Sequence, residues 1–293
     1  MVAVITCRYN IAEYQRPEAN FALFKASIQR QAELFVIELA YNQRPFRIPD
    51  ATSRLRTASV LWHKENLLNL LVKSLPQKYT TIAWVDADVL LSDQKWPAKT
   101  EKLLEKYRVV QLCSLVNQTR ENGQLLKQEA SIAQRLALAD FKLDPGLKGH
   151  PGMGWAVRRD FFDKVGLFEY LPVGGGDEAN FYSFIGIMPW FIFVSASQSL
   201  LGKLTQHVKQ AFQYTGGRVG FVSQTATHLW HGSLANRHYL QRQAILSDID
   251  ADNDIQPRQD GLLEWSDSAS PLLRQRILDY FYSRTEDAHD HDY

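Results

Sequence analysis

The sequence has few cysteines and almost no net charge. Cys7 and Cys113 are the only cysteines among 293 residues, too few for a disulfide framework or a four-cysteine zinc site. Basic residues exceed acidic ones by one, for a formal charge of +1, whereas nucleic-acid-binding domains normally carry a basic excess. The composition favours a reducing compartment and predicts no nucleic-acid partner.

Long apolar runs are also missing. The N-terminus has no basic segment followed by an apolar stretch, so we interpret it as a strand and not as a signal peptide. The most apolar later segment, residues 181–194, contains Pro189 and is too short to span a bilayer. We expect a cytoplasmic protein whose membrane contact is at most peripheral, through Trp190 and Phe191.

Strand-like and helix-like segments alternate in the first part of the chain. The patterns predict strands at residues 2–6, 35–39, 81–85 and 108–115, and helices at residues 19–34, 59–75 and 99–107. Strands that alternate with helices form mostly parallel sheets. We therefore expect an α/β fold with a Rossmann-like mixed, mostly parallel central sheet flanked by helices.

The second half of the chain is less regular. Residues 118–150 are polar and predict a loop or helix. Residues 118–149 could serve as a lid or as an acceptor-specific insert. Amphipathic spacing predicts helices at residues 159–165 and 271–282. We expect the polar tail from Ser283 to be frayed.

Two aspartates close the apolar run at residues 82–85. Asp86 and Asp88 alternate along the chain, so they share a face of an extended strand end. Two buried carboxylates are costly without a cation between them, and oxygen ligands suit Mg²⁺ or Mn²⁺. Ligands of open α/β sheets bind at the carboxyl ends of strands. The pair predicts a metal–diphosphate site; the alternative is two solvated turn carboxylates.

A second candidate is the HLWHG segment. His228 and His231 are three residues apart and precede Gly232. At this spacing both rings can approach one ion, and glycine lets the backbone close around a ligand. The alternative is a pair of ordinary core or surface histidines.

A third candidate is the glycine run at residues 174–176, followed by Asp177 and Glu178. Glycines let the backbone approach a bulky ligand, and the helix N-terminus after them favours anions. A carboxylate there can act as general base to a hydroxyl nucleophile. The alternative is that Asp177 only caps the helix.

Basic residues follow several expected strands, and arginine forks match phosphate oxygens. This set comprises Arg8, Arg54, Arg56, Lys64, Arg237 and Arg242. Arg8 directly follows the first strand and Lys64 lies in the helix before the aspartates. Each is alternatively a solvated surface charge. Trp155 is either a sugar-stacking side chain or a buried core residue.

Together these segments resemble the A-type nucleotide-sugar glycosyltransferase fold, in particular the β-1,4-galactosyltransferase and polypeptide N-acetylgalactosaminyltransferase group (the galactosyltransferase C-terminal-like domain), which includes bacterial chondroitin-type polymerases. The blocks that carry the resemblance are WHKENLLN (62–69), WVDAD (84–88), HPGMGWAVRRDFFDKVGLF (150–168), GGGDE (174–178) and HLWH (228–231). They occur in the order of the family and cover roughly residues 1–245.

The resemblance implies a UDP-sugar donor and a Mn²⁺ or Mg²⁺ cofactor. It implies that Asp88 binds the metal and that Asp86 contacts the ribose or shares the ion. His231 matches a late metal ligand of the family, and His228 falls where some relatives place a second one.

The resemblance also implies roles around the donor. Arg8 and Lys64 would hold the nucleotide and diphosphate, and Gly175, Gly176 and Trp155 would contact the donor sugar.

The family order of the acidic pair is Glu then Asp, whereas here Asp177 precedes Glu178. We favour Asp177 as the base, with Glu178 contacting sugar hydroxyls, and we favour inversion.

The expected organisation follows. Residues 1–245 would form the catalytic domain, with a nucleotide-binding half at 1–116 and an acceptor and sugar half at 117–245. Residues 246–293 would form a C-terminal helical extension and the frayed tail.

The predicted function is transfer of a hexose or N-acetylhexosamine from a UDP-sugar to a hydroxyl of a glycan or lipid-linked acceptor. One alternative is a non-catalytic nucleotide-sugar or glycan-binding module on the same fold. Another is a sugar nucleotidyltransferase, which normally has a glycine-rich phosphate loop after the first strand; here CRYN (7–10) occupies that place.

Overall fold

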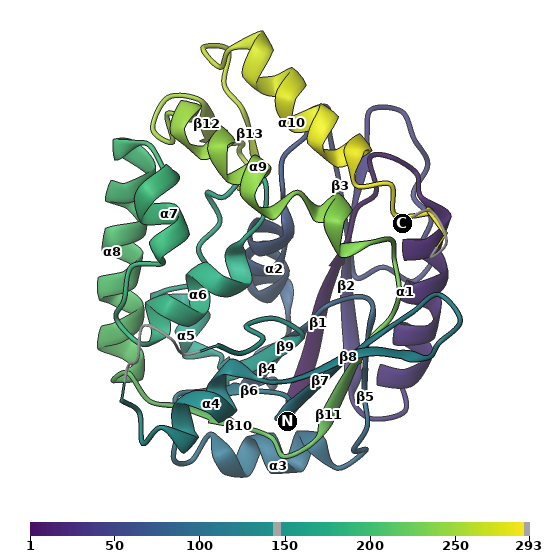
Figure 1. The fold of residues 1–293 in the computed structure, drawn as a ribbon, viewed down its shortest axis with the longest axis vertical. Coiled ribbons are helices and arrows are strands. Elements are labelled where there is room, and N and C mark those ends of the chain that lie inside the picture. Colours follow the sequence, from purple (N-terminus) through teal and green to yellow (C-terminus); the bar gives the residue numbers. More distant parts are fainter. Residues whose placement is uncertain (143–147, 290–293) are drawn as a thin grey trace.

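The computed structural model describes residues 1–142 and 148–289. Its main feature is a seven-stranded sheet with the strand order β10-β6-β9-β4-β1-β2-β3 (Figure 1). These strands are β1 (Val2–Arg8), β2 (Glu33–Tyr41), β3 (Ser53–Thr57), β4 (Thr81–Val85), β6 (Val109–Gln111), β9 (Gly154–Arg158) and β10 (Val219–Phe221). All neighbours pair in parallel except β9, which is antiparallel to both β4 and β6. The predicted α/β class with a mixed, mostly parallel central sheet is confirmed.

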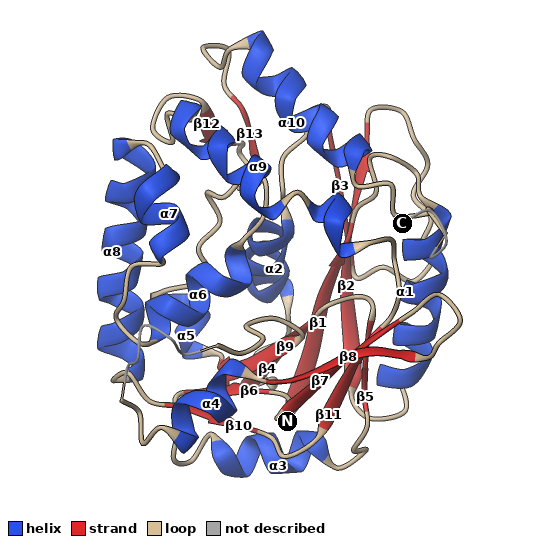
Figure 2. Cartoon of the chain, viewed as in Figure 1, coloured by secondary structure: helices blue, strands red, loops and turns tan. Residues whose placement is uncertain are grey.

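Helices cover both faces of this sheet (Figure 2). They are α1 (Gln15–Ile28), α2 (Lys64–Ser74), α3 (Trp96–Leu103), α4 (Ile132–Leu138), α5 (Asp160–Lys164), α6 (Gly176–Phe184), α7 (Trp190–Ser195), α8 (Gln198–Thr215), α9 (Tyr239–Gln243) and α10 (Pro271–Ser283). Strand β1 explains the two layers, because its alternate side chains enter different cores. Ala3 and Ile5 belong to the buried cluster that includes residues of α2, α6 and α8, while Val2 and Val4 belong to the one that includes residues of α1 and α3.

A smaller four-stranded sheet lies beside the ends of β4 and β6. Its order is β5 (Val89–Leu91), β11 (Thr225–His228), β7 (Leu115–Thr119) and β8 (Leu125–Ala130). β11 is antiparallel to β5 and parallel to β7. This sheet sets His228 opposite Val89, next to Asp88. A separate hairpin joins β12 (Ile255–Pro257) and β13 (Leu263–Trp265).

Several predicted boundaries are wrong. The strand expected at residues 108–115 is split between β6 and β7, because the chain passes from the large sheet to the small one: the Ser114 amide donates to the Gln224 carbonyl at 2.9 Å. The helix expected from residue 59 begins at Lys64. The segment before it is not helical, because the Trp62 amide donates its hydrogen bond to the Pro172 carbonyl at 2.9 Å.

Two further expectations are corrected. The region at 118–150, expected as loop or helix, contains the end of β7, β8 and α4 in its described part. The tail expected to fray after Ser283 is anchored at two positions, because Arg284 and Glu286 are buried, whereas Thr285, Asp287 and His289 are exposed.

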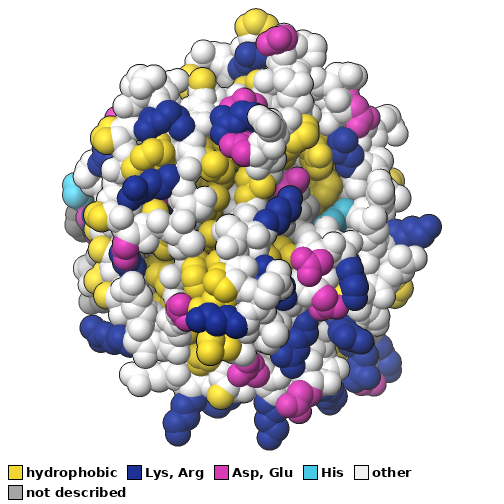
Figure 3. Space-filling model, turned by 180° about the vertical axis from the view of Figure 1, so that it is seen from behind, with side chains coloured by type: hydrophobic (Ala, Val, Ile, Leu, Met, Phe, Trp, Pro, Cys, Tyr) yellow, Lys and Arg dark blue, Asp and Glu magenta, His cyan; other side chains and the backbone are white. Residues whose placement is uncertain are grey.

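The surface carries both signs of charge. On the face opposite to that of Figure 1, acidic side chains are interspersed among the basic ones (Figure 3). No helix in the described ranges is both long enough and apolar enough to cross a membrane. On α7, Trp190 is 73% exposed.

Candidate active site

A cavity of about 460 Å³ opens at the carboxyl ends of β1 and β4. Residues from the end of β1, the β4–β5 turn, the start of α6 and the segment after β11 all line it. This is the edge at which ligands of open α/β sheets bind. The cavity therefore brings together the chain segments that the sequence singled out.

Asp88, His228 and His231 form one group in this cavity. Their ligand atoms all lie within 4.8 Å of one another. Oδ2 of Asp88 is 3.1 Å from Nε2 of His231 and 3.5 Å from Nε2 of His228, and the two Nε2 atoms are 3.0 Å apart. Gly232, with φ of 86°, lets the chain turn directly after the second histidine.

The chemistry of this group fits a divalent cation. Oδ1 of Asp88 is buried and has no hydrogen-bond partner, which is costly for a carboxylate unless a cation neutralises it. Burial raises the pKa of Asp88, but His228, His231 and Arg237 outweigh burial and hold it well below its usual value. Burial, with Arg237 nearby, lowers the pKa of His231 to about 4. The site thus offers one carboxylate and a neutral imidazole, the forms that bind metals.

One cation of the chain already touches this group. Nη2 of Arg237 lies 2.6 Å from Nε2 of His231. An ion bound at Nε2 would take the place of this contact, because two cations repel each other there.

The structure does not bring Asp86 into the triad. Its Oδ1 lies 2.5 Å from Nζ of Lys64, and its Oδ2 accepts the Met153 amide at 3.2 Å. The same Nζ lies 2.8 Å from Oδ1 of Asp177. Burial opposes the charge on Lys64, but Asp177 and Asp86 raise its pKa well above the ordinary value. One charged lysine therefore joins the two carboxylates.

The glycine run shapes the start of α6. Gly174 and Gly175 have φ of 85° and 101°, values that favour glycine. Gly176 is buried, and a Cβ there would lie 2.0 Å from Oε1 of Glu65. Burial raises the pKa of Glu65 to about 8. Of these glycines, Gly175 lines the cavity, whereas Gly176 lets α2 approach α6.

Asp177 and Glu178, the acidic pair in the first turn of α6, make different contacts. Asp177 is bound to Lys64, and burial raises its pKa although Lys64 opposes the shift. Glu178 also lines the cavity but lies in no ion pair within the described parts of the chain. Burial raises the pKa of Glu178 to about 7, with Arg242 opposing. Burial therefore raises the pKa of both carboxylates, but Asp177 is paired with a lysine and, among the described residues, Glu178 is not.

Two other predicted residues differ in outcome. Arg8 lines the cavity, with Nη2 2.6 Å from Oε1 of Glu18 and its Nε buried without a partner. Trp155 is 1% exposed and donates Nε1–H to the Pro151 carbonyl at 2.8 Å. The sugar-stacking role expected for Trp155 is wrong, because it packs in the core between β4 and β6 against Phe181.

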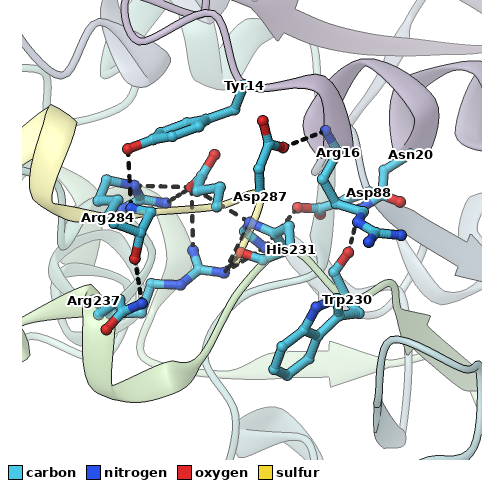
Figure 4. Close-up of polar contacts among 12 residues, drawn as sticks. Tyr14, Arg16, Asn20, Asp88, Trp230, His231, Arg237, Arg284 and Asp287 are labelled. Carbon is cyan, nitrogen blue, oxygen red and sulfur yellow. Dashed lines mark hydrogen bonds and ion pairs between the residues drawn. The ribbon is translucent and has the colours of Figure 1, made fainter. Parts of the chain in front are cut away.

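The sequence reasoning missed the C-terminal strap, residues 284–287, which reaches the triad (Figure 4). Oε1 of Glu286 lies 3.4 Å from Nδ1 of His231 and pairs with Arg284. Asp287 accepts the backbone amides of Gln15 at 2.8 Å and Arg16 at 2.7 Å, which ties the strap to the start of α1. No spacing signal could have revealed this, because the partners are far apart in sequence.

The sequence reasoning also missed aromatic side chains of the cavity. Trp62, Phe191 and Phe281 line it, and the rings of Trp62 and Phe281 stack with centroids 6.0 Å apart.

No protein-family model matches this chain, and no curated protein sequence matches it. Among solved structures, the catalytic domain of Drosophila β1,4-galactosyltransferase 7 in complex with xylobiose has a TM-score of 0.40 at 12% identity, over 96% of this chain and 98% of that one. A mutant of the same enzyme, in complex with manganese, UDP-Gal and xylobiose, has a TM-score of 0.32 at 12% identity, over 61% of this chain and 58% of that one.

Two other enzymes are similarly distant. Glucosyl-3-phosphoglycerate synthase from Mycobacterium tuberculosis, in complex with Mg²⁺ and UDP, has a TM-score of 0.39 at 12% identity, over 91% of this chain and 87% of that one. The 4-diphosphocytidyl-2C-methyl-D-erythritol synthase from Anaerococcus prevotii has a TM-score of 0.33 at 10% identity, over 76% of this chain and 87% of that one.

Proposed function

We propose that this protein is a metal-dependent glycosyltransferase of the A-type fold. It transfers a hexose or N-acetylhexosamine from a UDP-sugar to a hydroxyl of a glycan or lipid-linked acceptor. One observation carries the proposal: the triad of Asp88, His228 and His231 and the carboxylate of Glu178 face the same cavity at the carboxyl edge of a mostly parallel sheet.

The triad is the proposed metal site, with Mn²⁺ or Mg²⁺ held by Asp88, His228 and His231. Such an ion, when bound, neutralises the charge that develops on a leaving diphosphate. The unpartnered Oδ1 of Asp88 supports this assignment. Asp86, bound to Lys64, is proposed to face the ribose and not the ion.

Two arginine side chains of the same cavity form the proposed nucleotide site. Arg8 lies at the end of β1 and Arg237 beside His231, both within the cavity. Guanidinium forks match phosphate oxygens bidentately. We assign Arg8 to the nucleotide and Arg237 to the diphosphate, toward which it turns when it leaves His231.

We assign the general base to Glu178, in place of the Asp177 that the sequence favoured. A base works best with a pKa near the operating pH, and the pKa of Glu178 is about 7. Asp177 is held by Lys64 and is better suited to bind sugar hydroxyls. Glu178 takes the proton from the acceptor hydroxyl. At the same time the acceptor oxygen forms a bond to the anomeric carbon of the donor sugar, and the bond between that carbon and the diphosphate oxygen breaks, which releases UDP. A single displacement of this kind inverts the anomeric configuration.

The test is the thermal stability of the full chain against a panel of nucleotide sugars, with Mn²⁺ and with chelator. A ligand that binds the folded state raises the melting temperature by mass action. We expect a UDP-sugar to raise Tm only when Mn²⁺ is present, and the same UDP-sugar to yield UDP on addition of an acceptor. Binding of UDP without release of UDP from any UDP-sugar would support the non-catalytic binding module instead.

A further inference from the structure

In the described part of the chain, five lysine and arginine side chains line the cavity, and four of them have a carboxylate partner within 4 Å. The pairs are Arg8 with Glu18, Lys64 with Asp86 and Asp177, and Arg237 and Arg284 with Glu286. Arg242 is the fifth. Glu178 interacts with it electrostatically, but within the described ranges no carboxylate forms an ion pair with Arg242 within 4 Å. A cation removed from water without an anion is costly. An anion supplied from outside the chain would remove this cost.

In the described ranges, the hydrogen bond and the ring contacts of Arg242 are with neutral tyrosine side chains. It is 9% exposed, and its Nη1 donates to the Tyr280 hydroxyl at 2.8 Å. The same hydroxyl accepts Nη1 of Arg284 at 3.0 Å, so two guanidinium groups share one neutral acceptor. The Arg242 guanidinium lies 4.8 Å from the ring centre of Tyr239, and its Nε is buried without a partner. These contacts position the charge but do not neutralise it.

Arg242 lies next to an aromatic wall of the cavity. A Cβ at Gly174 would lie 3.3 Å from Nη1 of Arg242 and 3.1 Å from the indole of Trp62. The missing side chain at Gly174 therefore lets the guanidinium and the indole approach the same point. Trp62 is half-buried, lines the cavity and stacks on Phe281, which fixes its ring. A rigid aromatic face beside a buried cation suits a ring-shaped ligand that carries a negative charge.

We propose that Trp62 and Arg242 form a subsite for an acidic sugar, one that carries a carboxylate or a phosphate. The apolar face of the sugar ring packs on Trp62, and the anionic group pairs with Arg242. The inference rests on the proposed function and names its substrate class. The acidic group belongs either to the donor sugar or to the acceptor, because both approach Glu178 in the first turn of α6.

The experiment measures binding to the full chain by calorimetry in the presence of Mn²⁺. The donor arm compares UDP-glucuronic acid with UDP-glucose. The acceptor arm, with UDP present, compares methyl glucuronide and glucose 6-phosphate with methyl glucoside. We expect the acidic member of one arm to bind at least tenfold more tightly than its neutral counterpart, which also identifies the source of the charge.

Substitutions then assign the preference to Arg242. We expect Arg242→Gln to abolish the acidic preference while leaving the affinities for UDP and the neutral probe unchanged, and Arg242→Lys to retain part of it. Arg276→Gln removes a partly exposed arginine of α10 that pairs with Asp248, and should leave the preference intact. Melting temperatures confirm that each variant is folded; if Arg242→Gln unfolds, Arg242→Lys carries the test.

Three results would overturn the inference. One is equal affinity for acidic and neutral probes in both arms. Another is an acidic preference that Arg242→Gln leaves intact. The third is loss of UDP affinity in Arg242→Gln, which would assign Arg242 to the diphosphate. All three require that UDP binds with Mn²⁺; absence of that binding contradicts the proposed function itself and is thus recognised separately.

Discussion

Nδ1 of His231 lies 3.4 Å from Oε1 of Glu286, on the far side of the ring from the Nε2 atom that approaches Asp88 at 3.1 Å. One imidazole thus faces a carboxylate on each side. A carboxylate at Nδ1 favours the proton on Nδ1 and leaves the lone pair of Nε2, which Arg237 contacts at 2.6 Å, to bind a metal once Arg237 moves away. Glu286 is buried, and Arg284 holds it in place.

Removing Glu286 should therefore weaken metal binding. We expect Glu286→Gln to lower Mn²⁺ affinity by about 10–100-fold, the usual effect of removing a carboxylate behind a ligating histidine. Titration of the protein with Mn²⁺, followed by its paramagnetic resonance signal, measures this without any turnover. Asp279→Asn, an exposed position of α10 whose carboxylate accepts a hydrogen bond from Gln275, is the matched control. Unchanged affinity in Glu286→Gln would leave the strap a purely structural role.

The triad itself should be essential for metal binding. We expect Asp88→Asn to abolish both measurable Mn²⁺ binding and transfer, because the amide removes the one carboxylate of the site. Asp254→Asn, near the β12–β13 hairpin, is the control and should behave as the wild type. Near-wild-type transfer by Asp88→Asn would contradict the metal-dependent mechanism.

Glu178 should set the pH dependence of activity. A base must be ionised, so kcat/KM should fall as pH decreases below about 7, the pKa to which burial raises Glu178. Glu178→Gln should lower kcat by about 10²–10⁴-fold, the range of general-base catalysis. It should leave UDP affinity unchanged. The same profile measured in Asp177→Asn distinguishes the two carboxylates: if only Asp177→Asn removes the pH dependence, Asp177 is the base.

The same titration affects stability. Because the pKa of Glu178 is higher in the folded state than its ordinary value of 4.5, its contribution is fully present below 4.5 and is lost as pH rises through about 7. The Tm of Glu178→Gln relative to the wild type should therefore increase between pH 5 and pH 8. A difference in Tm that stays constant over this range would contradict the raised pKa.

Two glycines should respond in opposite directions to alanine. Gly176→Ala should destabilise the fold by about 1–3 kcal/mol or more, because its Cβ would lie 2.0 Å from buried Glu65. Gly202→Ala on α8 meets no atom within 4 Å and should stabilise by about 0.5–1 kcal/mol through helix propensity. Urea unfolding at one pH compares the two variants directly.

Local patterns predicted much of the fold. The apolar run before Asp86 is β4, and the glycine run before Asp177 does begin a helix. The alternation of strands and helices gave the parallel sheet, but not the break between β6 and β7. That break depends on which sheet each segment pairs with, and pairing energies are not encoded in the spacing of apolar residues within one segment.

The sequence by itself determined the class of the fold and the candidate residues, because hydrophobic period and residue chemistry are local properties of the chain. Only the tertiary structure decided which of those candidates lie together in the site and which do not. It separated Asp86 from the triad, because Asp86 forms an ion pair with Lys64. It also buried Trp155 in the core and placed Trp62 in the lining of the cavity. It also brought Glu286 to His231. Such contacts join segments far apart in sequence, and they arise only when the packed elements bring those segments together.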